Sequence, residues 1–492
     1  MARVVSHNEP VTIVGGGITG LAAASFLVSS GHAPERITVI EKSDRWGGHA
    51  RTLYLYKDGS GDVRIVSSYS IDLEDRERPL LRPSAPTPAF LSQFPTGAVE
   101  LRDPRILPTD TAFCIFTPSY LNYTRLLSQK VSYPIIDTSL KSHIRRSYHL
   151  RNDVFLESYL PLFGLWRHPL RFLTQIPQLI HLKWQMKHFI NAVDADELTT
   201  MTVSELCSER GIDGTIFGDL VSAMVALYSG YTTAHLRRAS ARYFVDFLGI
   251  TNMEGGFSGI TTALLGNSLS VHALVHDLQA AGVKMVANTP YDDTTGSGEP
   301  VLFAVHPWQV ASLRDLRFES LPVPVYVNRS EWGHFGADTH YRHTPESSHA
   351  THDIDRYRPD YPDYGVQITF GVTGQDQAYE AKIRGDAAAR GAPVEIVLVE
   401  DYRGEALDVH AVKIKWKHAY VTPEFERSRQ EVRGRQGTDS HWYASASLLR
   451  SARHEDGVTS ALDAVILMKG NEAGKMLLGE GFLPGTTSAP GK

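Results

Sequence analysis

The sequence predicts an α/β protein in which a Rossmann-like domain is combined with a second, α+β domain. Observations near the start of the chain carry this prediction. The apolar, β-branched residues 11–14 lead directly into the glycine-rich residues 15–20, and a small, apolar stretch from Leu21 follows as a buried helix. A second β-branched run, residues 37–40, ends at the acidic Glu41. Strand, tight turn, helix and strand in this order are typical of a dinucleotide-binding unit.

The glycines of the first turn have separate roles in such a unit. Gly15 permits the sharp turn, Gly17 lets the main chain approach a pyrophosphate, and Gly20 allows the helix to pack closely on the strand. The N-terminus of the helix then presents free N–H groups and the positive end of its dipole to the phosphates. Glu41 is placed to accept hydrogen bonds from ribose hydroxyls, which favours an unphosphorylated ribose.

The continuation of this segment distinguishes FAD from NAD. Residues 41–52 read EKSDRWGGHART. They resemble the E-x-x-x-R-x-G-G-x-x-x-T signature of the flavin amine oxidases and phytoene desaturase relatives. The resemblance implies that Gly47 and Gly48 give the pyrophosphate a second close approach of the main chain, with Arg45 and Arg51 near it.

Two later segments extend the resemblance to a subgroup of predicted FAD/NAD-binding amine-oxidase-like proteins. Residues 108–116 approximate a V-D-T-G-F-I-V-F strand that lies against the isoalloxazine ring in relatives, and residues 453–462 resemble an F-H-E-D-G-L-x-S-G-L motif. The second motif implies a helix N-terminus at the flavin pyrimidine, where negative charge gathers on reduction. Residues 442–447, WYASAS, lack the glycine of the C-G-A-W strand found in relatives.

Together these motifs imply bound FAD, and it is expected to be non-covalent because no His- or Cys-containing attachment motif is present. The expected cofactor-binding residues are Gly15, Gly17, Ile18, Thr19, Gly20, Glu41, Lys42, Arg45, Gly47, Gly48, His49, Arg51, Asp110, Thr111, Ala112, His454, Glu455, Asp456, Gly457 and Val458.

Catalytic residues are less clearly marked than the cofactor site. The lysine that many amine oxidases hold near flavin N5 is not identifiable. Residues 413–420, KIKWKHAY, predict a strand leading to the C-terminal cofactor region, and on it His418 and Tyr420 are candidates for a general acid or base. Both residues are also compatible with a packing role. His306 is interpreted as a structural histidine.

No metal site is expected from the histidine-rich segment. His340, His343, His349 and His352 lie among polar residues, where an extended loop presents histidines without fixing metal geometry. The only cysteines, Cys114 and Cys207, are far apart, which argues against thiolate metal sites and a disulfide framework.

Bulk composition narrows the class of protein. The 492 residues are 42% hydrophobic, which supports well-packed globular domains, and the formal net charge of −6 makes nucleic acid an unexpected partner. No signal-type N-terminus and no stretch long enough to span a membrane is visible, so a cytoplasmic location is expected.

Residues 158–193 are apolar, aromatic and basic. They predict helices packed on the core or, alternatively, a peripheral membrane or fatty-acyl entry face.

The expected FAD-binding domain is discontinuous, comprising residues 8–57, 260–308 and 437–478. The substrate domain takes residues 98–259 and 309–436, and strand-like runs at 322–327, 366–370 and 394–399 predict a mixed or antiparallel sheet in it. Residues 58–97 are expected to be an inserted surface loop and residues 483–492 a disordered tail.

The expected function is that of an FAD-dependent oxidoreductase that oxidises a C–N or C–C bond of a small hydrophobic substrate by hydride transfer. One alternative is a redox-neutral double-bond isomerase acting on a fatty-acyl or polyketide chain. A second alternative, raised by the altered residues 442–447, is a non-enzymatic flavoprotein. Substrate, electron acceptor and oligomeric state are left open.

Overall fold

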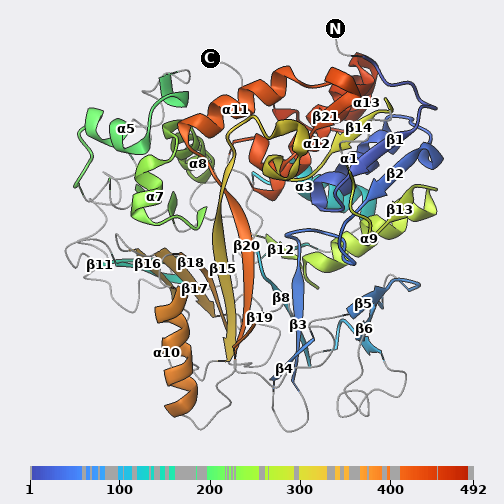
Figure 1. The fold of residues 1–492 in the computed structure, drawn as a ribbon. Helices are drawn as coiled ribbons and strands as arrows, with labels where there is room; N and C mark the ends of the chain where they lie inside the picture. The colour runs from blue at the N-terminus through green and yellow to red at the C-terminus, as the bar shows by residue number, and fades with distance from the viewer. Residues whose placement is uncertain are drawn as a thin grey trace.

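A computed structural model gives the fold (Figure 1). It describes residues 3–57, 63–66, 69–75, 78–83, 98–103, 105–112, 119–131, 135–137, 144–149, 155–160, 184, 197–215, 218, 221–222, 225–226, 229–253, 261–263, 265–292, 298–329, 338–343, 348–353, 366–373, 376–389, 396–398, 411–450 and 453–485. The long strands β15 (Glu319–Arg329) and β20 (Ala411–Tyr420) stand in the middle of the molecule (Figure 1). A parallel sheet lies on one side of them, and helices α5 (Val203–Glu209) and α7 (Thr233–Arg238) lie on the other.

The parallel sheet gathers five strands from three distant parts of the chain. Its order is β13-β2-β1-β14-β21, and every neighbouring pair is parallel. The strands are β1 (Val11–Val14), β2 (Ile37–Ile40), β13 (Lys284–Val286), β14 (Val301–Phe303) and β21 (His441–Tyr443). The first two are the runs predicted from the sequence, and the parallel, doubly wound arrangement confirms the predicted fold class.

Helices cover this sheet and hold its core. The helices of this half are α1 (Ile18–Ser29), α3 (Leu121–Val131), α9 (Asn267–Ala280), α12 (His454–Lys469) and α13 (Asn471–Gly479). Residues 18–27 of α1 are all buried because the helix is apolar or small on every face, and α12 packs along it. Phe26 of α1 makes an edge-to-face contact with Phe482, which follows α13, at 4.9 Å.

The second sheet has eight strands in the order β11-β10-β16-β17-β18-β15-β20-β19. The pairs β10/β16 and β19/β20 are parallel and the others antiparallel, so the sheet is mixed, as predicted. Its strands are β10 (Ile144–His149), β11 (Phe155–Leu160), β15 (Glu319–Arg329), β16 (Asp338–His343), β17 (Ser348–Asp353), β18 (Val366–Thr373), β19 (Ile396–Leu398) and β20 (Ala411–Tyr420).

The histidine-rich segment lies within this sheet, which differs from the expected polar loop. His340 and His343 are on β16, His349 and His352 are on β17, and the two strands pair antiparallel with His340 opposite Thr351. Threonine, tyrosine and histidine are compatible with a β-strand, but the polar composition of this segment led to the prediction of a loop.

Helices at the upper end of β15 and β20 form a separate apolar core. They are α5 (Val203–Glu209), α7 (Thr233–Arg238), α8 (Ala241–Met253) and α11 (Pro423–Gly434), while α10 (Asp376–Ala389) packs against β18. Phe244, Leu248 and Phe425 are fully buried there. Short 3-10 helices are η1 (Pro34–Arg36), η4 (Glu197–Thr199), η5 (Pro307–Gln309), η6 (Ala311–Leu313), η9 (Thr438–Ser440) and η10 (Ala446–Leu448).

Residues 58–97, expected to be a surface loop, contain three strands in their described part. These are β4 (Val63–Val66), β5 (Tyr69–Asp72) and β6 (Leu80–Pro83). The strand β4 pairs with β3 (Thr52–Lys57), which also pairs with β8 (Ile106–Asp110), while β6 lies between β5 and β7 (Val99–Glu100). The strands were not predicted, because their apolar runs are short and lie among many proline, serine and arginine residues. A further small sheet pairs β9 (Ile135–Asp137) with β12 (Thr261–Ala263).

Two other expectations fall largely outside the described residues. Of residues 158–193, only 158–160 and Trp184 are described, so the proposed membrane-facing segment lies outside them. The start of the expected tail is ordered, because both the N–H and the carbonyl of Leu483 bond to the Asn122 side chain; residues 486–492 are outside the described part.

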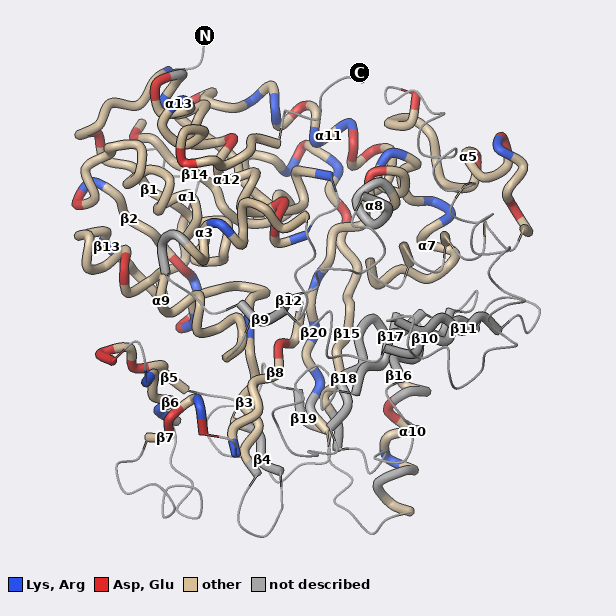
Figure 2. Tube along the Cα trace, turned by 180° about the vertical axis from the view of Figure 1, so that it is seen from behind, with Lys and Arg blue, Asp and Glu red and all other residues tan. Residues whose placement is uncertain are grey.

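Charged residues of both signs are spread over the described chain. Figure 2 shows basic and acidic residues interspersed along the described chain. Within the same residues, no helix combines the length and apolarity needed to cross a bilayer.

Candidate functional site

Two glycine turns meet at the start of α1. The N–H of Gly47 donates to the carbonyl of Gly16 at 2.8 Å, and Gly17 and Gly47 form a parallel bridge. A Cβ placed on Gly17 would have one near neighbour, the Cα of Gly48 at 3.9 Å. Two stretches of main chain therefore face each other without an intervening side chain, which is the arrangement a pyrophosphate needs for close approach.

The first turn depends on glycine for steric reasons. Gly15 adopts a φ of +109°, which L side chains rarely adopt. A Cβ on Gly20 would lie 1.9 Å from the carbonyl oxygen of Gly15, well inside van der Waals contact. The chain can close this turn only without a side chain at residue 20.

The N-terminus of α1 is open to an anion. Gly17 is the N-cap residue, no side chain caps the helix, and its first turn has no acidic residue. The first N–H groups and the positive end of the helix dipole are therefore available to a phosphate. The start of α12 lies close by, because a Cβ on Gly457 would be 2.6 Å from Oγ1 of Thr19.

Glu41 and Arg45 support the two turns through the backbone. The Glu41 carboxylate accepts hydrogen bonds from the N–H of Gly16 at 2.8 Å and from the N–H and hydroxyl of Ser43 at 2.9 and 2.8 Å. Arg45 donates to the carbonyl of Gly48 at 3.0 Å. Each carboxylate oxygen has more than one lone pair, so Glu41 can still accept from a ribose hydroxyl.

Three distant segments meet beside the second glycine turn. The N–H and hydroxyl of Thr111 donate to the carbonyl of Arg51 at 2.9 and 3.0 Å. The indole N–H of Trp416, on β20, donates to the carbonyl of Thr111 at 2.9 Å. Ala112 is half-buried next to them. The predicted flavin neighbours thus lie between the glycine turns and the large sheet.

Hydrogen bonds from two other residues hold the Asp110 carboxylate in place. One oxygen of its buried carboxylate accepts from the Thr52 hydroxyl at 2.6 Å and from the N–H of Asn267, the first residue of α9, at 2.8 Å. Its side chain therefore links β3 and β8 to the start of α9.

Four histidines converge where the two sheets approach each other. His49 follows the second glycine turn, His306 follows β14, His418 lies on β20 and His454 begins α12; we call these four residues the histidine cluster. The His49 ring lies 5.3 Å from that of His306, 5.9 Å from that of His418 and 4.6 Å from the Trp416 indole. Nε2 of His49 is buried and has no hydrogen-bond partner among the described residues.

Burial lowers the pKa of all four imidazoles, and repulsion by neighbouring histidines lowers the pKa of His49, His306 and His454 further. Desolvation is the main cause that lowers the pKa of each: to about 4 for His306, to about 3 for His454, and below the ordinary value of 6.5 for His49 and His418. Arg45 lowers the pKa of His49 further, and Lys42 that of His306. At neutral pH the cluster offers neutral rings that can donate and accept.

Tyr420, predicted beside His418 as a catalytic candidate, lies elsewhere. Its hydroxyl donates to the carbonyl of His235 on α7 at 3.0 Å, and its ring packs edge-to-face on Tyr231. Burial raises its pKa to about 12. The structure therefore brings His418, and not Tyr420, together with the glycine turns.

The acidic residues of the HEDG motif stabilise helix starts. The Glu455 carboxylate accepts from the N–H groups of Asn122 and Tyr123 at 2.9 and 2.8 Å, so it caps α3, and burial raises its pKa to about 7. Asp456 accepts from the N–H of Arg453 at 3.1 Å and completes a capping box of α12. Gly457 and Val458 lie on the buried side of α12. The motif thus positions the helix, while His454 alone among its residues joins the histidine cluster.

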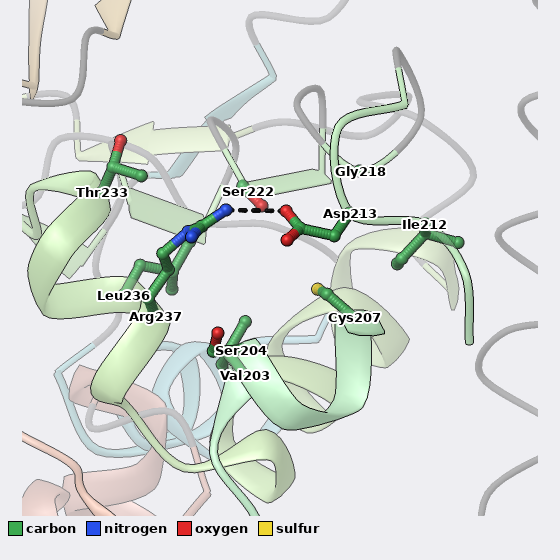
Figure 3. Close-up of a pocket in the computed structure, with 10 residues that line it drawn as sticks. All are labelled: Val203, Ser204, Cys207, Ile212, Asp213, Gly218, Ser222, Thr233, Leu236 and Arg237. Carbon is green, nitrogen blue, oxygen red and sulfur yellow. Dashed lines mark hydrogen bonds and ion pairs between the residues drawn. The ribbon is translucent and has the colours of Figure 1, made fainter. Parts of the chain in front are cut away.

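A separate small pocket lies between α5 and α7. Figure 3 shows the Cys207 sulfur beside an ion pair in which Arg237 and Asp213 are 2.7 Å apart. Burial raises the pKa of the Cys207 thiol to about 11, so the thiol is protonated and unreactive at neutral pH. The helices α5 and α7 at this pocket are capped by the side chains of Thr202 and Thr232, so their N-termini are not open to an anion as that of α1 is.

The sequence did not predict that Trp416 lies at this site or that the four histidines lie close together. The available signal was the alternation of Trp416, His418 and Tyr420 on one face of a strand. Among the residues that the structure describes, no group of three or more His, Cys, Asp or Glu side chains is arranged to hold a metal ion.

Sequence comparison finds relatives of the N-terminal segment. Residues 13–70 match a family of NAD(P)-binding Rossmann-like domains. The chain is 34% identical to the putative L-amino-acid oxidase YobN of Bacillus subtilis (strain 168) over 19% of each chain, and 44% identical to the L-amino acid oxidase Lm29 of Lachesis muta over 14% of each. The matches thus span less than a fifth of these relatives' own length.

Structural comparison extends the likeness to nearly the whole chain. A CLA-producing fatty acid isomerase from P. acnes has a TM-score of 0.58 at 14% identity, covering 93% of this chain and 98% of the other. Cyclohexylamine oxidase from Brevibacterium oxydans IH-35A has a TM-score of 0.56 at 13% identity, covering 94% and 99%. At these identities the likeness establishes the fold.

Proposed function

Because this chain has the fold of the flavin amine-oxidase-like superfamily, we propose that it is an FAD-dependent oxidoreductase. It oxidises a C–N or C–C bond of a small hydrophobic substrate by hydride transfer. The observation that carries the proposal is the meeting of the two glycine turns, where Gly17 faces Gly48 with no side chain between them.

The residues present fit FAD. The N-terminus of α1 and the two glycine turns would hold the pyrophosphate, and Glu41 would accept hydrogen bonds from the adenosine ribose. The hydrogen-bonded series of the Arg51 carbonyl, Thr111 and the Trp416 indole would lie along the flavin. The orphaned Nε2 of His49 is a further polar atom in need of a partner. We propose that these residues hold FAD without a covalent bond to it.

Bound FAD supplies the hydride acceptor, and this chain supplies position and charge. His418 is neutral near pH 7 because burial lowers its pKa, so its imidazole can accept a proton from the reacting group of the substrate. The start of α12 carries the positive end of a helix dipole, which stabilises negative charge developing nearby. Trp416 is buried and keeps water from one side of the site.

A redox-neutral isomerase is the second candidate. The fatty acid isomerase has a TM-score similar to those of the oxidases, so the fold is equally compatible with double-bond migration in an acyl chain. Both candidates use the same cofactor site and differ in whether electrons leave the protein.

Replacement of Gly17 by alanine tests the cofactor assignment. The glycine has a φ of −72°, which alanine tolerates, and its Cβ would meet only the Gly48 Cα at 3.9 Å. We expect Gly17→Ala to fold normally but to lose most of its FAD, measured by visible absorption after reconstitution and by thermal unfolding. The matched control is Gly385→Ala on α10, where a Cβ meets nothing within 4 Å. Full flavin occupancy in Gly17→Ala would contradict the assignment.

Anaerobic addition of substrates separates the two candidates. An oxidoreductase bleaches its flavin bands when an oxidisable amine or acyl substrate is added without oxygen. An isomerase keeps its bands in the steady state while an unsaturated fatty acid is converted to an isomer. A wild-type protein that cannot be reconstituted with FAD would contradict both.

A further inference from the structure

A tight turn packs against the sheet beside His418. We call residues 229–231 the Ser229 turn. At its centre Gly230 has a φ of +70°, and a Cβ there would lie 2.6 Å from the side chain of Val323 on β15. Val323 pairs with Trp416 of β20, and His418 lies two residues further along the same face of that strand. The absence of a side chain at Gly230 therefore lets the turn lie directly on the face that carries His418.

The Tyr231 side chain anchors this turn to β20. Its fully buried hydroxyl donates to the carbonyl of Ala419 at 2.6 Å and accepts from the N–H of Val421 at 3.0 Å. These two backbone groups follow His418 directly in the chain. Because the hydroxyl acts as both donor and acceptor, it holds the turn and the end of β20 at a fixed separation.

Ser229 is held from a second direction by α8. Its hydroxyl lies 2.6 Å from the hydroxyl of Tyr243, and both residues are buried, so water does not compete for the hydrogen bond between them. The backbone carbonyl of Ser229 accepts a hydrogen bond from the ring of His418. The turn thus contacts His418 through its backbone, while its side chains fix that backbone to α8 and β20.

The hydrogen bond to Ser229 selects one form of the His418 imidazole. A neutral imidazole carries one N–H and one unprotonated nitrogen, and only the N–H can donate to a carbonyl. The ring nitrogen that faces Ser229 is therefore protonated, and the other nitrogen can accept a proton. The ring of His418 lies 5.9 Å from that of His49, which follows the second glycine turn, so the ring that carries this nitrogen borders the cofactor half.

We propose that the Ser229 turn positions His418: the Ser229 carbonyl fixes the tautomer of the ring, and Tyr231 and Tyr243 fix that carbonyl. The inference rests on the proposed function, in which His418 accepts a proton from the substrate. The opposite tautomer would present an N–H to the substrate and could not act as a base. Ser229, Tyr231 and Tyr243 are therefore positioning residues, which act through His418.

The experiment measures the tautomer of His418 in the FAD-loaded protein without any substrate. Proton–nitrogen correlation spectra of isotope-labelled histidine rings distinguish the two neutral tautomers, and the signal that is lost in His418→Gln identifies this residue. The spectra are recorded above the ordinary pKa of histidine, so that the ring is neutral. We expect one tautomer of His418 to exceed the other by about tenfold or more in wild type.

Two variants break the bond between Ser229 and Tyr243 from opposite sides. Ser229→Ala keeps the backbone carbonyl but removes the hydroxyl, and Tyr243→Phe removes the hydroxyl of the partner. In each variant the tautomer ratio of His418 is expected to fall by about fivefold or more. The double variant should show no further fall, because both substitutions remove the same hydrogen bond.

The matched control is Tyr326→Phe. Tyr326 is a fully buried tyrosine of β15 whose hydroxyl bonds to the carboxylate of Glu380 at 3.1 Å. This variant also loses a buried hydroxyl from the large sheet, but His418 should keep the wild-type tautomer ratio. The visible absorption of bound FAD should stay at the wild-type level in every variant, which shows that the cofactor site is intact.

Two results would overturn the inference. Similar populations of both tautomers in wild type would show that the Ser229 carbonyl selects neither, and an unchanged ratio in Ser229→Ala or Tyr243→Phe would show that the turn does not position the ring. If one variant fails to fold the other decides, and if both fail the wild-type spectrum decides alone. A protein that binds FAD and is reduced by a substrate, but has mixed tautomers, contradicts this inference alone, whereas a protein that binds no FAD contradicts the proposed function.

Discussion

The indole N–H of Trp416 donates to the carbonyl of Thr111 at 2.9 Å across 305 positions of the chain. Trp416 belongs to the large mixed sheet, and Thr111 follows β8 beside the glycine turns. Both residues are buried, so water cannot replace the lost partner if the bond is removed. This hydrogen bond couples the sheet that carries His418 to the cofactor half.

Trp416→Phe is predicted to destabilise the protein by about 1–3 kcal/mol, because it leaves the Thr111 carbonyl without its donor. The change is measured as the free energy of unfolding in urea. Trp184→Phe is the control, since Trp184 is 58% exposed, and its effect should stay within about 0.5 kcal/mol. Equal effects of the two substitutions would show that the hydrogen bond contributes nothing.

Gly20→Ala is predicted to prevent closure of the first turn. The new methyl group would lie 1.9 Å from the carbonyl oxygen of Gly15, and neither backbone segment can move without disturbing the sheet. We expect a strong loss of both thermal stability and flavin binding. Gly385→Ala should instead leave flavin binding unchanged and raise stability by up to about 1 kcal/mol, as expected for an exposed helical glycine. A normal Gly20→Ala protein would disprove the steric requirement.

The first turn was predictable because its determinants are adjacent in sequence. Gly15, Gly20 and Glu41 belong to one strand-turn-helix-strand unit, and their spacing alone encodes the geometry. Gly47 and Gly48 were assigned to the same site through the resemblance of residues 41–52 to the flavin amine-oxidase signature, and the bridge of Gly47 to Gly17 is compatible with that assignment.

The convergence of distant side chains was not predictable in the same way. His418 reaches the site because β20 pairs with β15 in one register, with His418 opposite Leu321. A shift by one residue would turn His418 to the other face of the sheet. Glu455 was expected to contact the cofactor, but its carboxylate caps α3 through Asn122 and Tyr123. These residues lie more than 300 positions earlier in the chain, so no local sequence pattern predicts the cap.

Glu455 is predicted to make stability depend on pH. Its pKa is about 7 in the folded protein against an ordinary 4.5, so the folded state binds the proton more tightly. The stabilisation from this group is complete below its ordinary pKa and is lost as the pH rises through 7. Relative to wild type, Glu455→Gln should gain about 3 kcal/mol of unfolding free energy between about pH 4 and pH 8.

The control for this measurement is Glu424→Gln, whose side chain is 45% exposed and pairs with Arg427 on the surface. Its stability relative to wild type should be nearly constant over the same pH range. A constant difference between wild type and Glu455→Gln would mean that the buried carboxyl titrates normally.

His306 is predicted to make the stability depend on pH in the opposite sense to Glu455. Burial lowers its pKa from 6.5 to about 4, so its contribution to stability is complete above 6.5 and is lost as the pH falls towards 4. His306→Gln should therefore lose less unfolding free energy than wild type between about pH 7 and pH 5, by about 1–2 kcal/mol. Urea unfolding at both pH values checks this, with His276→Gln as the exposed control. Parallel pH profiles of His306→Gln and wild type would contradict the prediction.

The arrangement of the parallel sheet also governs how the chain matures on the ribosome. β1 and β2 are synthesised early, but their outer neighbours β14 and β13 come from the second half of the chain, and β21 emerges later still. Until those strands are synthesised, β1 and β2 each have one unpaired edge, to which strands of other chains can bind. Because the sheet is completed only by residues 441–443, translation arrest before that point yields an aggregation-prone fragment instead of a smaller working protein.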